Sequence, residues 1–155
     1  MRTVFKVFGI VLTFALIGSL LVVGQRRLSA QGPFLVAGPV TETEVVKLQL
    51  NHYFTPDRQA HNPDFEWTFT PTEFVLKKAQ GPIPADLREQ LLPAHTTTNN
   101  IRGKWKLDKT GQQLLLTEIT AGEKKGKENV TLFIYKTAST IVRIGEPQYV
   151  FSVGQ

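Results

Sequence analysis

The stretch IRGKWKLDKTGQQLLLTEI, residues 101–119, decides the fold class of this 155-residue chain. Its first half alternates between charged residues and a second series made up of Ile101, Gly103, Trp105 and Leu107. A period of two residues is that of a β-strand with one buried face. The turn sequence DKTG at 108–111 follows, and the leucine-rich segment 112–120 predicts the next strand. We therefore predict an antiparallel hairpin.

The same alternation recurs over most of the chain after residue 43. Apolar residues alternate with polar ones in short segments, and turn residues separate the segments. About eight strands are predicted in this way, at residues 46–50, 65–69, 73–78, 101–107, 112–120, 130–136, 140–144 and 148–153. Because their connections are short, we expect an antiparallel meander that forms a small barrel or a strongly curved sheet.

One segment within this β region has a different period. In PADLREQLL, residues 84–92, a proline opens the segment and Leu87, Leu91 and Leu92 fall on one face, which predicts a short amphipathic helix. The predicted fold class is therefore mainly β with one short helix, together with a hydrophobic helix at the N-terminus.

The first 30 residues have the layout of an export signal. A basic start precedes an uninterrupted apolar run from Val7 to Val23, and small and polar residues follow. The run is longer than a signal core of about 7–15 residues and shorter than a span of about 20, so its length does not distinguish a signal peptide from an N-terminal membrane anchor. We expect an extracytoplasmic protein, secreted or tethered to the membrane by this segment. The predicted divisions are 1–30, the signal or anchor; 31–43, a linker; and 44–155, the β domain.

The net charge of +5 comes mainly from this leader. Four of the 18 basic residues lie in the first 30 positions, which hold no acidic residue, and residues 31–155 carry 14 basic against 13 acidic groups. A nearly neutral domain lacks the electrostatic attraction that supplies non-specific affinity for nucleic acid, and we expect no such partner. The chain has no cysteine, which excludes disulfides and thiolate metal sites.

The charged side of the strand at 101–107 carries Arg102, Lys104 and Lys106. A surface that stacks nucleic-acid bases needs cations and an aromatic ring on the same face. The alternation places Trp105 on the opposite face. We therefore interpret the basic row as a solvated face that discourages pairing with other strands.

The densest group of polar residues lies in NHYFTPDRQAHNPDFEW, residues 51–67. The group comprises His52, Asp57, His61, Asp64 and Glu66. The histidines lack the spacing of a helical metal site, and TPD and NPD are common turn sequences, so we expect a polar loop. His52 continues the predicted face of Leu48 and Leu50, at the rim of the barrel.

Other sequence signals of catalysis are weak. His95 follows the predicted helix in a loop, and no serine after the leader stands in a G-x-S-x-G motif. The chain contains neither a P-loop nor a G-x-G-x-x-G sequence. We expect no enzyme: no catalytic residue, no metal and no cofactor.

The segment GKWKLD, residues 103–108, together with the turn and the leucine-rich strand that follow it, resembles the repeated G-x-W-x-L-D element of lipocalin-like bacterial domains. The resemblance extends over about residues 65–151. It implies a small antiparallel barrel, often exported, whose best-known relatives bind small apolar molecules. It offers no catalytic residue.

On these grounds the expected function is binding rather than catalysis. A small apolar ligand would lie against Trp67, Phe69 and Trp105, beneath the predicted helix, whose Leu87 and Leu91 would form a lid. The alternative is a structural or protein-interaction module with an unknown protein partner and a core filled by its own side chains. A barrel of eight strands is compatible with either arrangement.

Overall fold

The computed structural model describes residues 37–145 and 148–155, which belong to one compact unit. The predicted signal or anchor at 1–30 and the first part of the predicted linker lie outside these residues. The elements in the described part of the chain are α2 (Glu42–Val45), β1 (Leu48–Phe54), β2 (Ala60–His61), β3 (Phe65–Phe69), β4 (Glu73–Lys78), α3 (Ala85–Leu91), β5 (Asn100–Leu107), β6 (Gln113–Ala121), β7 (Lys124–Lys125), β8 (Asn129–Ala138), β9 (Ile141–Ile144) and β10 (Tyr149–Val153).

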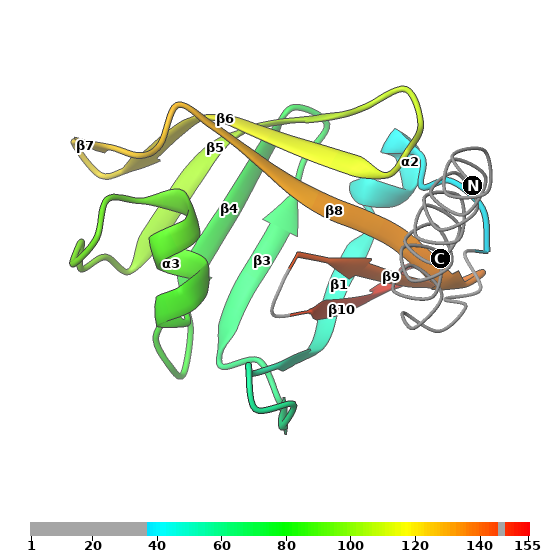
Figure 1. Ribbon diagram of the computed structural model, residues 1–155, viewed down its shortest axis with the longest axis horizontal. Helices are drawn as coiled ribbons and strands as arrows, with labels where there is room; N and C mark the ends of the chain where they lie inside the picture. Colours follow the sequence, from blue (N-terminus) through cyan, green and yellow to red (C-terminus); the bar gives the residue numbers. More distant parts are fainter. Residues whose placement is uncertain (1–36, 146–147) are drawn as a thin grey trace, which may run out of the picture. The chain divides into compact units, whose positions relative to one another are not determined.

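The strands form one antiparallel sheet that curls into a half-barrel (Figure 1). The order across the sheet is β2-β1-β10-β9-β8-β6-β5-β4-β3, and β7 pairs with β6 outside this path. Strands β3 to β10 follow each other as a meander, which confirms the expectation from their short connections. β1 pairs with β10, so the first and the last strand of the domain lie side by side. The prediction of a mainly β, strongly curved antiparallel sheet is confirmed.

The two ends of the sheet meet through side chains. β1 lies close to β3, but no backbone ladder joins these two strands among the described residues. Instead, the rings of Tyr53 on β1 and Phe65 on β3 lie 5.8 Å apart between centroids. Both rings also contact Tyr149 on β10. Aromatic packing therefore holds these edges together in place of hydrogen bonds.

The concave side of the sheet carries the core. In β5, Ile101, Gly103 and Trp105 are buried while their charged neighbours are exposed, as the two-residue period predicts. Gly103 is required by packing, because a Cβ atom at this position would come within 2.7 Å of both the Phe74 ring and the Thr117 carbonyl oxygen. With the exception of Val150 on β10, the buried apolar side chains of the described residues form one cluster.

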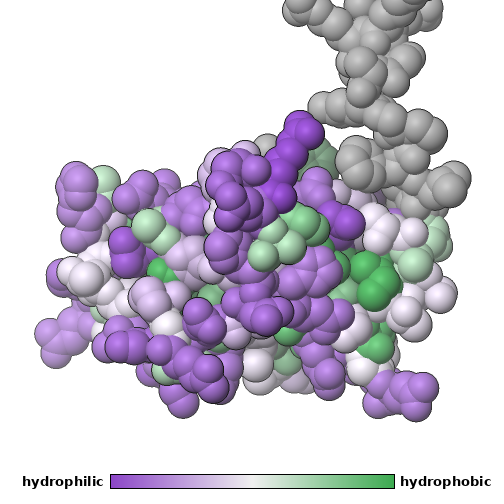
Figure 2. Space-filling model, turned by 90° about the horizontal axis from the view of Figure 1, so that it is seen from below, coloured by the Kyte–Doolittle hydropathy of each residue, from purple (hydrophilic) through white to green (hydrophobic). Residues whose placement is uncertain are grey.

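The outer side of the sheet is more polar. The face shown in Figure 2 is covered mainly by hydrophilic residues, with hydrophobic residues in separate groups. In β8, Leu132 and Ile134 point into the core and Phe133 between them points outward, with 68% of its surface exposed. Because successive side chains of a strand point to opposite faces, the large aromatic side chain of Phe133 is exposed to solvent.

The start of the domain differs from the prediction. Residues 42–45, expected to lead into the first strand, form the short helix α2, and Val46 is its C-terminal cap rather than a strand residue. A capping box explains the helix, because the Thr41 hydroxyl accepts a hydrogen bond from the Glu44 backbone NH and the Glu44 carboxylate accepts one from the Thr41 NH. Within the predicted linker, Val40 is 2% exposed and belongs to the core.

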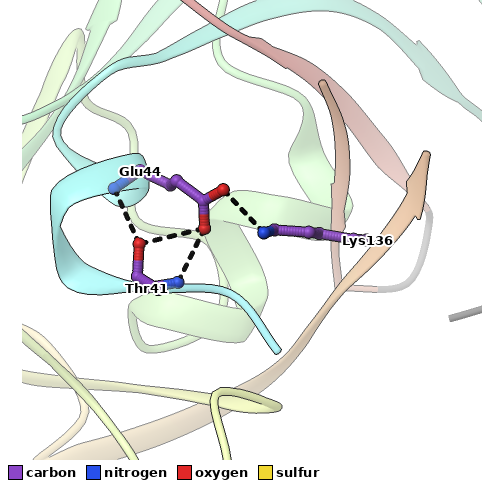
Figure 3. A network of polar contacts seen from close by, with 3 residues as sticks. All are labelled: Thr41, Glu44 and Lys136. Atoms are coloured by element: carbon purple, nitrogen blue, oxygen red, sulfur yellow. Dashed lines mark hydrogen bonds and ion pairs between the residues drawn. The ribbon is translucent and has the colours of Figure 1, made fainter. Parts of the chain in front are cut away.

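An ion pair attaches α2 to the sheet. The Glu44 carboxylate lies 2.6 Å from Lys136 Nζ on β8 (Figure 3), and the two side chains are only 22% and 13% exposed. Burial raises the pKa of Glu44, but hydrogen bonds from Lys136 and Thr41 outweigh burial and the pKa lies below its ordinary value. Val45, fully buried on the same helix, anchors it in the core.

A β-bulge changes the direction of the side chains along β1. Leu50 pairs with Phe151, but His52 pairs with Val150, so the register shifts between Leu50 and His52. Tyr53 consequently packs against the core. His52 faces the other way and contacts Phe54, so the expectation that it continues the Leu48 and Leu50 face is wrong.

Candidate functional site

The structure brings all five predicted ligand-binding residues into the core cluster. Trp67 and Phe69 come from β3, Trp105 comes from β5, and Leu87 and Leu91 come from α3. Each side chain is at most 7% exposed. The helix lies over the inner side of the curled sheet, where Figure 1 shows it in front of β4.

The aromatic part of this cluster forms a continuous chain of ring contacts. Trp67 stacks on Phe69 at 5.8 Å between ring centroids, and Phe69 meets Trp105 edge to face at 6.1 Å. Two further rings, Tyr149 and Phe151 from β10, contact Trp67 at 5.3 and 5.5 Å. The prediction omitted these two as site residues. Their alternation in QYVFSV indicates a buried face, but the sequence does not show that β10 lies opposite β3.

The two tryptophans differ in their hydrogen bonding. Trp105 Nε1 donates to the Thr70 carbonyl oxygen at 2.7 Å. Trp67 Nε1 is buried and has no hydrogen-bond partner among the described residues, and the same is true of the Tyr149 hydroxyl. Trp67 is 2% exposed and Tyr149 is 1% exposed. Two polar atoms are therefore unpaired within an apolar cluster, where pairing is the rule.

The Tyr149 hydroxyl is buried in the core, and the negative charge of Asp86 acts on it. Burial raises the pKa of Tyr149 far above its ordinary value, and the charge of Asp86 on α3 raises it further. Asp86 has the same effect on the pKa of Tyr53, after burial and the charge of Asp64. The hydroxyl thus lies within the electrostatic reach of the first turn of α3.

Helix α3 is attached mainly through its two flanks. Before the helix, the Gly81 NH donates to the Asp64 carbonyl oxygen at 2.7 Å. At its C-terminal end, the Lys127 NH donates to the Leu91 carbonyl oxygen at 2.9 Å, and Lys127 Nζ donates to the Glu89 carbonyl oxygen at 2.6 Å. Between these points the seven-residue helix buries Leu87 and Leu91, and it has no side-chain N-cap.

The loop that holds the end of α3 is closely packed. A Cβ atom at Gly126 would come within 2.5 Å of Ile119 Cγ2 and within 2.8 Å of the Leu91 carbonyl oxygen. The Gly126 NH donates to the Ile119 carbonyl oxygen at 2.7 Å. Only glycine leaves room for the helix to approach β6 and β7 in this way.

The polar segment 51–67 does not assemble a metal site in the described structure. His61 stacks on Tyr53 at 5.4 Å, and the side chains of Asp57 and Thr55 are hydrogen-bonded to each other. Among residues 37–145 and 148–155, no three histidine, aspartate or glutamate side chains converge on one point. His95 lies on an exposed turn with φ of 62°.

The basic row points outward as expected. Arg102, Lys104 and Lys106 are exposed on the side of β5 opposite to Trp105. Lys104 Nζ lies 2.9 Å from the Glu118 carboxylate, and this hydrogen bond and charge raise the pKa of Lys104. Part of the row is therefore neutralised by an acid on the neighbouring strand.

No family model matches the chain, and no curated protein or solved structure matches it significantly. Within residues 37–145 and 148–155, no helix has the length and apolar content needed to span a membrane.

Proposed function

We propose that this chain is an exported, non-catalytic, lipocalin-like protein that binds a small apolar ligand on the inner side of the half-barrel, beneath α3. The observation that supports binding is the position of α3. A helix of seven residues, whose flanks are hydrogen-bonded to Asp64 and Lys127, packs its leucines into the core that contains the aromatic rings. Export is proposed from the sequence of residues 1–30 alone.

The chemistry of the cluster selects an apolar molecule. No polar or charged residue of the described chain is buried in it, apart from the polar atoms of its tyrosine and tryptophan rings. An apolar ligand gains about 25 cal/mol for each Å² of surface that it buries there. Because Leu87 and Leu91 already occupy the space over the rings, the ligand enters as the helix moves outward and replaces leucine contacts with its own.

Tryptophan fluorescence tests this proposal directly. The chain has two tryptophans, Trp67 and Trp105, and both lie in the cluster. We would titrate the full-length chain with N-phenyl-1-naphthylamine, a neutral apolar fluorophore that accepts energy from tryptophan. Saturable energy transfer, reversed by competing alkanes, is the expected result.

A second measurement looks for a ligand from the host. Native mass spectrometry of the gently purified full-length chain would show an excess mass of small-molecule size that disappears on denaturation. The proposal is refuted if the native mass equals that of the chain and the fluorophore shows no saturable transfer.

The alternative of an interaction module with a filled core rests on Phe133. Its 68% exposure on the outer face of β8 gives the domain one prominent apolar contact point. Under this alternative, a Phe133→Thr variant would lose self-association or partner binding in analytical ultracentrifugation while its unfolding free energy stays unchanged. Under the binding proposal, the same variant retains wild-type energy transfer to the fluorophore.

A further inference from the structure

The unpaired polar atoms of the aromatic cluster define the kind of ligand that fits it. Trp67 Nε1 and the Tyr149 hydroxyl belong to rings 5.3 Å apart between centroids, and neither has a partner within the described residues. A buried polar group without a partner is destabilising in a native protein, so each such group needs a specific explanation. The other tryptophan of the cluster meets this need, because Trp105 Nε1 donates to the Thr70 carbonyl oxygen. Outside the cluster, Arg88 Nε, Asn100 Oδ1 and Arg143 Nε are also buried without a partner among the described residues.

The donor chemistry determines the complementary group. An indole NH can only donate, and a phenol hydroxyl can donate or accept. The common partner of the two groups is an acceptor oxygen, and a carbonyl oxygen has two lone pairs, one for each donor. An ammonium group fails at Trp67 because it offers no acceptor.

The charges around the cluster determine whether a charged or a neutral acceptor group is favoured there. Asp86 is the charged group that acts on the Tyr149 hydroxyl, and it is negative. No cationic residue of the described chain is fully buried near the rings. A carboxylate placed there would lose its hydration and meet a like charge, whereas a ketone, ester or amide would not.

From this geometry we propose that the ligand is an apolar molecule with an uncharged carbonyl group, and that Trp67 Nε1 and the Tyr149 hydroxyl donate hydrogen bonds to its oxygen. The proposal rests on the proposed function, because it assumes that the site beneath α3 is occupied by a ligand. It goes further in assigning the polar group that the ligand carries and the two side chains that recognise it.

Arg88 supplies the competing hypothesis. Its Nε atom on α3 is also buried without a partner among the described residues. An anionic ligand would pair with this guanidinium. The hypothesis is distinguished from ours by the charge of the preferred compound and by the side chain whose replacement weakens binding.

The experiment compares three compounds of equal carbon number: methyl heptyl ketone, nonane and nonanoic acid. Each would displace N-phenyl-1-naphthylamine from the full-length wild-type chain and from the variants Trp67→Phe and Tyr149→Phe. Either substitution removes the polar atom and keeps an aromatic ring. Tyr53→Phe is the matched control, since it removes a hydroxyl from a ring that stacks on Tyr149.

We expect each of the two variants to weaken ketone binding by about fivefold to tenfold, the value of one hydrogen bond, and to leave nonane binding unchanged within twofold. Tyr53→Phe should change neither. In wild type, the infrared C=O band of the bound ketone should lie at a lower frequency than that of the ketone in hexane. If Trp67→Phe does not fold, Tyr149→Phe and the infrared band decide the question.

The other outcomes separate the two proposals. If nonane and the ketone bind and both variants affect them equally, the carbonyl assignment is overturned and the apolar site stands. If nonanoic acid binds most tightly and only Arg88→Gln weakens its binding, the site recognises an anion through Arg88 and the carbonyl assignment is overturned. If no compound displaces the fluorophore and the fluorophore itself does not bind, the proposed function fails and this inference fails with it.

Discussion

Replacing Tyr149 with phenylalanine should stabilise the free protein. The side chain is 1% exposed, and its hydroxyl has no partner among the described residues. Leaving a buried hydroxyl unpaired costs about 1–3 kcal/mol. Removing it opens a gap of about 10 Å³, which costs about 0.2 kcal/mol. A net stabilisation of about 1 kcal/mol follows, which is about 4 °C in Tm for a domain of about 120 residues.

The assay is urea unfolding of the full-length chain, followed by far-ultraviolet circular dichroism, with the m-value used to confirm a common unfolding transition. Trp105→Phe is the contrasting variant. The Trp105 indole NH is hydrogen-bonded to the Thr70 carbonyl oxygen. Replacing Trp105 with phenylalanine removes this hydrogen bond and leaves a gap in the core, so it should destabilise the domain by about 2–4 kcal/mol. A Tyr149→Phe variant less stable than wild type by more than about 0.5 kcal/mol would refute the reasoning, because the hydroxyl would then have a stabilising partner in solution.

Three further predictions concern α2, the turn between β5 and β6, and the loop after β7. Glu44→Gln should cost about 1–2 kcal/mol at neutral pH, because it breaks the pair with Lys136. Since the folded pKa of Glu44 is depressed, the stability it contributes is present above its unfolded pKa of about 4.5 and is lost as the pH falls through the lower folded value. The variant should therefore show a shallower acid limb in urea unfolding at a series of pH values. Asp108→Asn tests the same linkage in the β5–β6 turn, where the Thr110 hydroxyl and the backbone NH groups of Gln112, Gln113 and Thr110 lower the pKa of Asp108 to about 2. Wild type should lose this contribution between about pH 4 and pH 2, and a variant with an equally steep acid limb in that range would contradict the assignment. Gly126→Ala should loosen α3 and raise the affinity for N-phenyl-1-naphthylamine severalfold. Gly122→Ala is the control for backbone strain alone: its Cβ atom would meet nothing within 4 Å, but the φ of 64° disfavours alanine, so it should lower stability and leave the affinity unchanged.

The local pattern of the sequence was sufficient to predict most of the sheet. Strand β5 follows from strict alternation because one of its faces is buried and the other is charged. Strand β6 follows from its leucine-rich sequence after the turn, although its alternation breaks at Thr117 and Glu118. Helix α3 follows from its leucine spacing. Helix α2 was missed although its signal, Thr41 with Glu44 three residues later, is present, because Val46, Leu48 and Leu50 imitate a strand.

Long-range features were beyond this kind of reasoning. The bulge at His52 depends on how β1 meets β10, a pairing between opposite ends of the domain. The predicted site residues do meet, because a single core collects every inward aromatic side chain. A polar atom in that core has a hydrogen-bond partner only where the fold places a suitable backbone or side-chain group next to it, and the sequence pattern does not show this. Trp67 and Trp105 follow the same alternating pattern, yet only Trp105 has a carbonyl oxygen in reach.

The choice between a ligand-binding protein and a filled core depends on the cost of moving α3. Exposing Leu87, Leu91 and Leu92 costs about 6 kcal/mol at about 2 kcal/mol for each fully buried leucine. The open state would then be about 10⁻⁴ of the population, and a ligand with nanomolar affinity for that state would show an apparent Kd of about 10 µM.

An apolar surface alone barely offsets this cost, because the ligand only replaces the contacts that the leucines already make. Pairing Trp67 Nε1 and the Tyr149 hydroxyl is different, because the helix leaves both atoms unsatisfied and a carbonyl oxygen satisfies them. Two such hydrogen bonds contribute about 1–3 kcal/mol that the closed state lacks. The polar atoms therefore give a ligand with a carbonyl group an advantage over an alkane of the same size in competing with the helix.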